Sequence, residues 1–114
     1  MIDDGAPPAS LLERLDLIRT HPGLYLGVVP PHFAAMLERL DTWIVGYSEA
    51  VRAHHVRDPG LEIYSSFWQF LEERFGRGMS EGTIPTIRLL TIDDAEAWET
   101  YWRLLDEFRA SAGA

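Results

Sequence analysis

The hydrophobic residues between positions 32 and 56 have the spacing of one face of a long helix. Successive apolar positions are separated by four or three residues, which keeps them on one side of an α-helix. Gly46 interrupts this helix at a cost of about 1 kcal/mol relative to alanine, so we expect another element to approach closely there. The pattern predicts one amphipathic helix over 32–56, with an apolar stripe of Phe33, Leu37, Leu40, Ile44, Tyr47, Val51 and His54.

Three further segments combine a capping residue with an apolar face. A small polar residue followed three positions later by Glu or Gln predicts the first turn of a helix. The pairs are Ser10 with Glu13, Ser66 with Gln69, and Asp93 with Glu96. We expect the first of these helices to end at Pro22-Gly23 and the second to end at Gly76 and Gly78.

The segments between these helices are assigned to loops, with one alternative left open. Residues 21–31 indicate an apolar loop that packs onto the domain, and the glycine-rich residues 76–86 indicate a flexible loop. Residues 87–92 fit a short strand or a buried extended segment, because so short an apolar run has no diagnostic period. The sequence therefore predicts a mainly α protein: a compact four-helix domain with one long central helix, and one short strand or extended segment near 87–92.

The length of 114 residues fits one domain. We expect a single helical domain at 10–110 between flexible tails at 1–9 and 111–114, because small residues dominate both ends. No apolar run approaches the ~20 residues of a membrane span. The acidic start of the sequence is also unlike a signal peptide, so the expected location is cytoplasmic, without membrane contact.

Acidic residues outnumber basic ones, and the net charge is −8. All ten basic residues are arginines, and they are scattered along the chain. Binding to nucleic acid requires cations that neutralise phosphates, so no nucleic-acid partner is expected. The same charge would attract a basic protein and speed its association.

The residues that usually carry catalysis or bind metals are missing or poorly spaced. The absence of cysteine excludes disulfides, zinc ribbons, iron–sulfur clusters and thiol catalysis. His54 and His55 are adjacent and would diverge on a helix. No His-x-x-x-His or Gly-x-Ser-x-Gly pattern occurs. We therefore predict no catalytic residue, no metal site and no cofactor.

The most distinctive local string runs from Ile18 to Gly27. Pro22 disfavours a helical conformation at the preceding residue, and Gly23 permits a positive φ. Tyr25 is expected to bury its ring while its hydroxyl bonds to the backbone. We interpret this string as a structural corner, with a role in a binding surface as the alternative. The residues assigned a structural role are Pro22, Gly23, Tyr25, Gly27, Gly46 and Tyr47.

Four pieces of the chain, taken in order, resemble a small uncharacterised bacterial protein family with an Arg-x-x-Pro-Gly-Met-Tyr-Leu-Gly motif. Here they read Arg19…His21-Pro22-Gly23-Leu24-Tyr25-Leu26-Gly27, Gly46-Tyr47-Ser48-Glu49-Ala50, Phe67-Trp68-Gln69-Phe70-Leu71 and Leu104-Leu105-Asp106-Glu107-Phe108. Leu24 replaces the family's methionine, and His21 replaces a basic residue. Some members resemble toxin-immunity proteins, so the resemblance implies a binding function and assigns no catalytic residue.

Our leading hypothesis is a non-enzymatic binding protein, and specifically an immunity protein that occludes a basic toxin domain. Acids would pair with the partner's cations, and a tryptophan at the rim would anchor the interface. The candidate partner-binding residues are Trp43, Trp68, Glu72, Glu73, Asp93 and Asp94. The alternative is a helical accessory or regulatory module that binds a small ligand or forms a homodimer through the stripe from Phe33 to His54.

Overall fold

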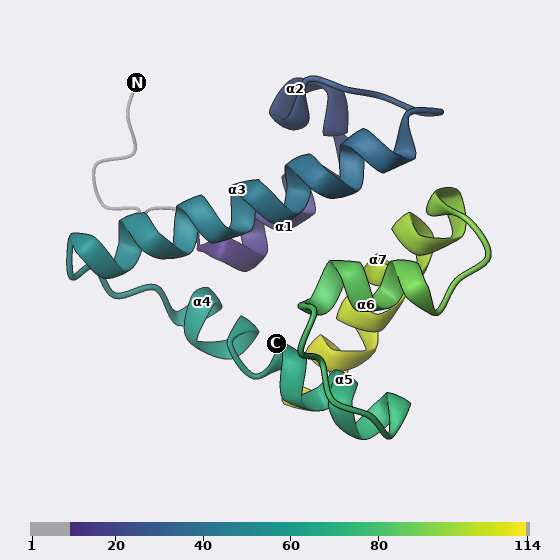
Figure 1. Ribbon diagram of the computed structural model, residues 1–114. Helices are drawn as coiled ribbons and strands as arrows, with labels where there is room; N and C mark the ends of the chain where they lie inside the picture. Colours follow the sequence, from purple (N-terminus) through teal and green to yellow (C-terminus); the bar gives the residue numbers. More distant parts are fainter. Residues whose placement is uncertain (1–9, 114) are drawn as a thin grey trace.

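The computed structural model describes residues 10–113, which form seven helices and no strand (Figure 1). The mainly α prediction is confirmed, but three short helices add to the four expected. The predicted tail at 1–9 lies outside the described residues, and α7 continues beyond residue 110. The helices are α1 (Leu11–Thr20), α2 (Pro22–Leu26), α3 (Phe33–Ala53), α4 (Pro59–Tyr64), α5 (Phe67–Phe75), α6 (Thr83–Leu89) and α7 (Asp94–Ala112).

Two of the short helices begin at Pro-Gly pairs, one of which, Pro22-Gly23, was predicted to end the first helix. Pro22 is the first residue of α2, and Pro59 is the first residue of α4. Proline suits this position because the first helical N–H needs no partner within the helix. Each pair therefore ends one helix and begins another. The connecting segment 21–31 is also less packed than expected, because Leu26 is buried while Leu24 and Val29 are exposed.

The prediction of a strand or extended segment at 87–92 is wrong. Residues Thr83–Leu89 form α6, and its C-terminal cap is Leu90. Ile84 and Ile87 are buried, and their three-residue separation places them on one helical face. Pro85 lies in the first turn, where a missing N–H costs nothing. The β-branched residues favoured an extended reading, but burial of one helical face decided the conformation.

The predicted long helix is present as α3, but α7 takes the central position. Figure 1 shows α3 along one side of the molecule, whereas α7 packs against α3, α5 and α6. The middle of the α3 stripe, Leu37, Leu40 and Ile44, is buried in the core, while His54 is exposed. The middle of this stripe is therefore covered within the chain, while Val51 near its C-terminal end remains partly exposed.

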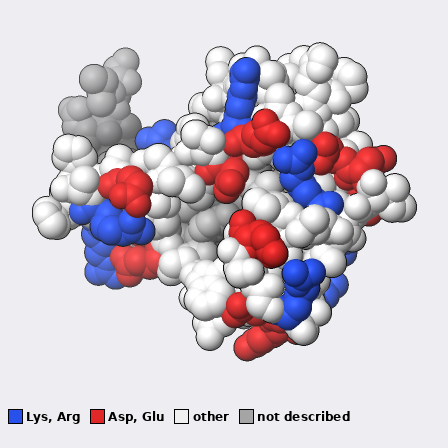
Figure 2. Space-filling model, viewed as in Figure 1, with Lys and Arg blue, Asp and Glu red and all other residues white. Residues whose placement is uncertain are grey.

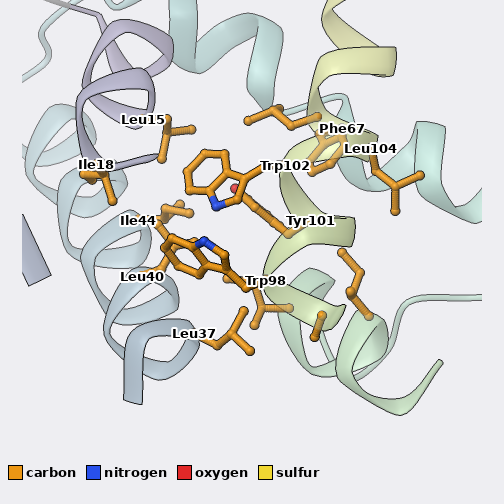
Figure 3. Close-up of a cluster of buried hydrophobic side chains, with 14 of the residues drawn as sticks. Leu15, Ile18, Leu37, Leu40, Ile44, Phe67, Trp98, Tyr101, Trp102 and Leu104 are labelled. Carbon is orange, nitrogen blue, oxygen red and sulfur yellow. The ribbon is translucent and has the colours of Figure 1, made fainter. Parts of the chain in front are cut away.

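The core forms where aromatic side chains of α7 meet leucine and isoleucine side chains of α1 and α3 (Figure 3). Trp98 and Trp102 pack edge to face with ring centroids 5.4 Å apart. Tyr101 is fully buried and meets Phe67 of α5 at a centroid distance of 5.9 Å. Aromatic rings contribute large buried areas, so α7 supplies much of the hydrophobic stabilisation.

A buried carboxylate joins α1, α3 and α4 at one junction. Asp58 is 6% exposed and caps α4 by accepting a hydrogen bond from the N–H of Leu61 at 3.0 Å. The same carboxylate accepts from the N–H of Leu11 at 3.1 Å and from the hydroxyl of Tyr47. Burial and the Asp58 carboxylate raise the pKa of Tyr47. We call this arrangement the Asp58 junction.

The predicted helix caps have different outcomes. The box of Ser10 and Glu13 is confirmed, since both of its reciprocal hydrogen bonds are present. Asp93 caps α7 as predicted, accepting from the N–H of Glu96 at 2.8 Å. Ser66 precedes α5 but makes no side-chain cap bond, because its own backbone is already helical after α4.

The segment 76–86, predicted as a flexible loop, is partly packed. Gly76 ends α5 in the left-handed conformation, as predicted, with φ of 66°. Met79 is buried, and its N–H donates to the Glu72 carboxylate at 3.3 Å. The last residues of the segment belong to α6. The segment therefore closes over the end of the core.

Candidate interaction surface

The two tryptophans proposed as anchors have different environments. Trp43 is half-buried and stacks on Tyr47 with ring centroids 5.3 Å apart. Trp68 is 49% exposed and lies beside Arg52 at a small hollow of about 300 Å³. Trp98 and Trp102 are buried in the core. Trp68 is thus the tryptophan that remains available for a partner.

The predicted acids at the start of α7 are engaged within the chain. Asp94 receives two hydrogen bonds from Arg88, at 2.8 and 3.2 Å. These contacts, with a further ion pair to Glu38, raise the pKa of the Arg88 guanidinium. Asp93 is occupied as the α7 cap. Both carboxylates therefore stabilise the fold before any partner binds.

The predicted acids on α5 lie at the other end of α7. Glu72 accepts from the Met79 N–H, and Glu73 is exposed. Arg74 of α5 pairs with Glu107, fourteen positions after Asp93. At 1.5 Å per residue, that separation is about 20 Å along α7. The four acids therefore do not form one patch, and Figure 2 shows acidic and basic side chains interspersed on the face that it presents.

The Pro22–Gly27 string does form a local structural unit. A Cβ on Gly23 would lie 2.7 Å from the Val29 side chain, so any larger residue would require the Val29 side chain to shift. Gly27 ends α2 with φ of 73°, a conformation that favours glycine. Arg39 of α3 donates to the Leu26 carbonyl at 2.9 Å. These contacts fold the corner onto the first turns of α3.

Three expectations about individual structural residues have mixed outcomes. Tyr25 is 38% exposed, so its ring is not buried as predicted. A Cβ on Gly46 would meet no atom within 4 Å, so no element approaches this glycine. Tyr47 does have a structural role, because its hydroxyl donates to Asp58.

A groove with a volume of about 740 Å³ lies between α6 and α7. One wall comes from α6 and the residues that follow it, and the other wall is the outer face of α7. The ends of α1 and α5 contribute one residue each. We call it the α6–α7 groove; it is lined by Arg19, Phe75, Ile87, Leu90, Thr91, Glu96, Glu99, Thr100, Arg103 and Asp106.

Apolar side chains project into solvent where α6 meets α7. Leu89 is 65% exposed, Leu90 is 46% exposed and Ile92 is 89% exposed. We call these three residues the apolar turn. Leu90 also lines the α6–α7 groove, so exposed apolar surface continues into the hollow. Exposed apolar residues that adjoin a groove are typical of an interaction site.

Acidic and basic groups of the groove differ in how they are paired. Arg19 pairs with Asp106 at 2.8 Å, and Arg103 pairs with Glu107 at 3.4 Å. Within residues 10–113, neither Glu96 nor Glu99 has a cationic group within ion-pair distance. Glu96 accepts only the backbone N–H of Ile92, at 3.1 Å. The groove therefore offers negative charge that the chain does not neutralise.

These groove residues were not among the predicted partner-binding residues. Glu96 was assigned only a capping role, and the apolar turn was placed in a short strand or a buried extended segment. The available signal was the three-residue spacing of Asp93, Glu96 and Glu99, which places acids along one side of a helix. That signal is weak, because the same spacing occurs on solvated helix faces.

Two tyrosine hydroxyls pair with each other at the core. The hydroxyls of Tyr64 and Tyr101 lie 2.8 Å apart. Burial raises the pKa of Tyr64 to about 12 and also raises the pKa of Tyr101. Burial likewise raises the pKa of Asp41, whose charge acts on both tyrosines. Both hydroxyls therefore stay protonated near neutral pH, so neither provides a phenolate base.

The described part of the chain contains no group of three or more His, Asp and Glu side chains placed to hold a metal ion. Among the helices of residues 10–113, none combines the length and the apolar character needed to cross a membrane. Comparison with protein-family models, curated proteins and solved structures gives no match.

Proposed function

We propose that this protein is a non-enzymatic binding protein that occludes a basic protein partner, in the manner of an immunity protein acting on a toxin domain. The observation that carries the proposal is the α6–α7 groove, where the apolar turn adjoins two acids without a cationic partner. Protein interfaces combine an apolar centre with a polar rim, and this region has both.

Electrostatics support a basic partner in particular. The net charge of −8 would attract a cationic protein from beyond the contact distance and raise the association rate. At the groove, Glu96 and Glu99 would meet the partner's arginines or lysines without breaking an internal ion pair. Because both glutamates are exposed, their desolvation cost is small.

The apolar turn would contribute affinity, while the acids would contribute rate and specificity. Burying Leu89, Leu90 and Ile92 removes exposed apolar area from water, at roughly 25 cal/mol for each Å². A cationic cleft covered in this way could no longer reach its substrate. Inhibition by occlusion requires no catalytic group on this chain.

The test is co-expression with the product of the adjacent gene, followed by purification and isothermal titration. We expect a one-to-one complex with a basic protein, whose association slows as salt rises from 50 to 300 mM. Glu96→Gln/Glu99→Gln should reduce both the association rate and its salt dependence. Glu49→Gln/Glu62→Gln removes two exposed acids outside the groove, each paired with an arginine, and is the control of equal charge change; it should alter both much less.

Two results would overturn the proposal. One is a failure of the neighbouring product to bind. The other is binding whose rate is the same in the double variant and the wild type. Light scattering on the purified protein tests the alternative of self-association, because a stable homodimer would cover the apolar turn with a second copy.

A further inference from the structure

The α6–α7 groove is long enough to bind one short helix. Its α7 wall extends from Glu96 to Asp106. Ten residues of α-helix rise about 15 Å, which matches nearly three turns of a helix lying alongside. The volume of about 740 Å³ accommodates several side chains from one face of such a helix.

Other ways of recognising a peptide fit this groove poorly. Addition of a β-strand requires a free sheet edge, and residues 10–113 contain no strand. Proline-rich segments bind grooves lined with several aromatic rings, and Phe75 is the aromatic residue here. Acidic or phosphorylated motifs require free arginines, whereas Arg19 and Arg103 are already paired with acids.

The chemistry of the groove specifies which helix would bind. Leu90 is exposed and Phe75 is partly exposed, and both provide apolar contacts, so the docked face needs aliphatic residues at helical spacing. Glu96 and Glu99 lie three residues apart on α7, so they present two carboxylates about one helical turn apart. Lysines or arginines flanking the aliphatic face would meet them.

We propose that the α6–α7 groove binds a single basic amphipathic helix of the partner, with its aliphatic face on Leu90 and its cations on Glu96 and Glu99. This inference rests on the proposed function, since it names the segment of the basic partner that is recognised. It differs from that function in predicting binding to an isolated helix of suitable pattern.

The test uses three synthetic 16-residue peptides with the purified full chain. The first places leucines at i, i+3, i+4 and i+7 with lysines elsewhere on the same side. The second has the same composition in an order that breaks this spacing, and the third replaces lysine by glutamate. Binding is measured by fluorescence anisotropy, and helix formation by circular dichroism, because short free peptides are only marginally helical.

We expect the first peptide to bind and become helical, and the other two to bind at least about tenfold more weakly. Leu90→Asp should weaken the first peptide by about tenfold or more, the range of a central interface residue. Val56→Asp, at a similarly exposed residue outside the groove, is the control and should bind normally. Thermal unfolding of each variant establishes that it is folded, and Ile92→Ser provides a second, milder variant.

Equal binding of the first two peptides would overturn the helix inference, as would normal binding by both folded variants, Leu90→Asp and Ile92→Ser. Neither result affects the co-purification test. Conversely, selective peptide binding with no complex from the adjacent gene product would overturn the proposed function and leave the groove as a helix-binding site.

Discussion

The Asp58 junction and the apolar turn each follow the end of one helix, but the junction ties three helices together and the turn leaves its side chains in solvent. At the junction, one buried carboxylate accepts hydrogen bonds from Leu11, Leu61 and Tyr47. At the turn, Leu89 and Ile92 are largely exposed, and Glu99 nearby has no cationic partner in the described chain. Both connections directly follow a helix that packs in the core, so their different burial does not result from different distances to the core.

The comparison separates residues that hold the fold from residues available to a partner. Replacing a buried group that has several hydrogen-bond partners lowers the stability of the fold, because each donor left without an acceptor stays desolvated. Exposed apolar residues can change with little effect on stability. The junction should therefore respond to mutation in stability, and the turn in binding.

The largest effect is expected for Asp58→Ala. The substitution leaves two backbone N–H groups and the Tyr47 hydroxyl without their acceptor, so the free energy of unfolding should fall by about 3 kcal/mol or more. Urea unfolding followed by circular dichroism measures the change. A loss below about 1 kcal/mol would show that the junction does not hold the three helices together.

Two glycine substitutions test whether stability depends on close packing near the Asp58 junction. A Cβ on Gly60 would lie 2.6 Å from the Ser10 hydroxyl and 3.1 Å from the backbone nitrogen of Leu12, so Gly60→Ala should cost about 2 kcal/mol. Gly46→Ala meets open space within a helix and should stabilise by about 1 kcal/mol. Chemical denaturation measures the free energy of unfolding of both variants. If Ser10 can move aside freely, Gly60→Ala will not be destabilising, which would contradict the prediction.

High pH should weaken the fold through the buried tyrosine pair. The pKa of Tyr64 is raised to about 12, so between pH 10 and 12 the unfolded chain loses this proton while the folded chain keeps it. Stability from this group is complete below pH 10 and should then fall by on the order of 1 kcal/mol per pH unit. Thermal unfolding across this range measures the slope, and Tyr64→Phe should make it shallower. A slope identical in both proteins would contradict the assignment.

The smallest effect on stability is expected at the apolar turn. Ile92→Ser replaces an exposed side chain and should change the free energy of unfolding by less than about 0.5 kcal/mol. The same denaturation assay used for Asp58→Ala compares the two regions directly. A loss of 2 kcal/mol or more would place Ile92 among the residues that hold the fold.

The parts of the fold that sequence patterns predicted were those governed by local geometry. The capping box of Ser10, the Asp93 cap and the periodic apolar face of α3 each depend on residues within a few positions of one another. The short helices α2, α4 and α6 were missed because five to seven residues contain too few turns to show a period. Tertiary burial, as at Ile84 and Ile87, decides such segments.

The candidate site was harder to predict than the fold. Exposure of Leu89, Leu90 and Ile92 depends on where α6 ends relative to α7, which no local pattern specifies. Similarly, Asp94 appeared available until the structure placed Arg88 against it. Which acids remain free of a cation is a property of the assembled molecule, so the choice between acids could not come from sequence.

The central position of α7 constrains the order of events during synthesis. The aromatic residues Trp98, Tyr101 and Trp102 reach the ribosome's exit last among the elements of the core. Until they emerge, the faces of α1 and α3 that pack against α7 stay uncovered, although contacts of α1 with α2 and α4 can already form. We therefore expect the core to be completed only after α7, Asp94–Ala112, has been translated.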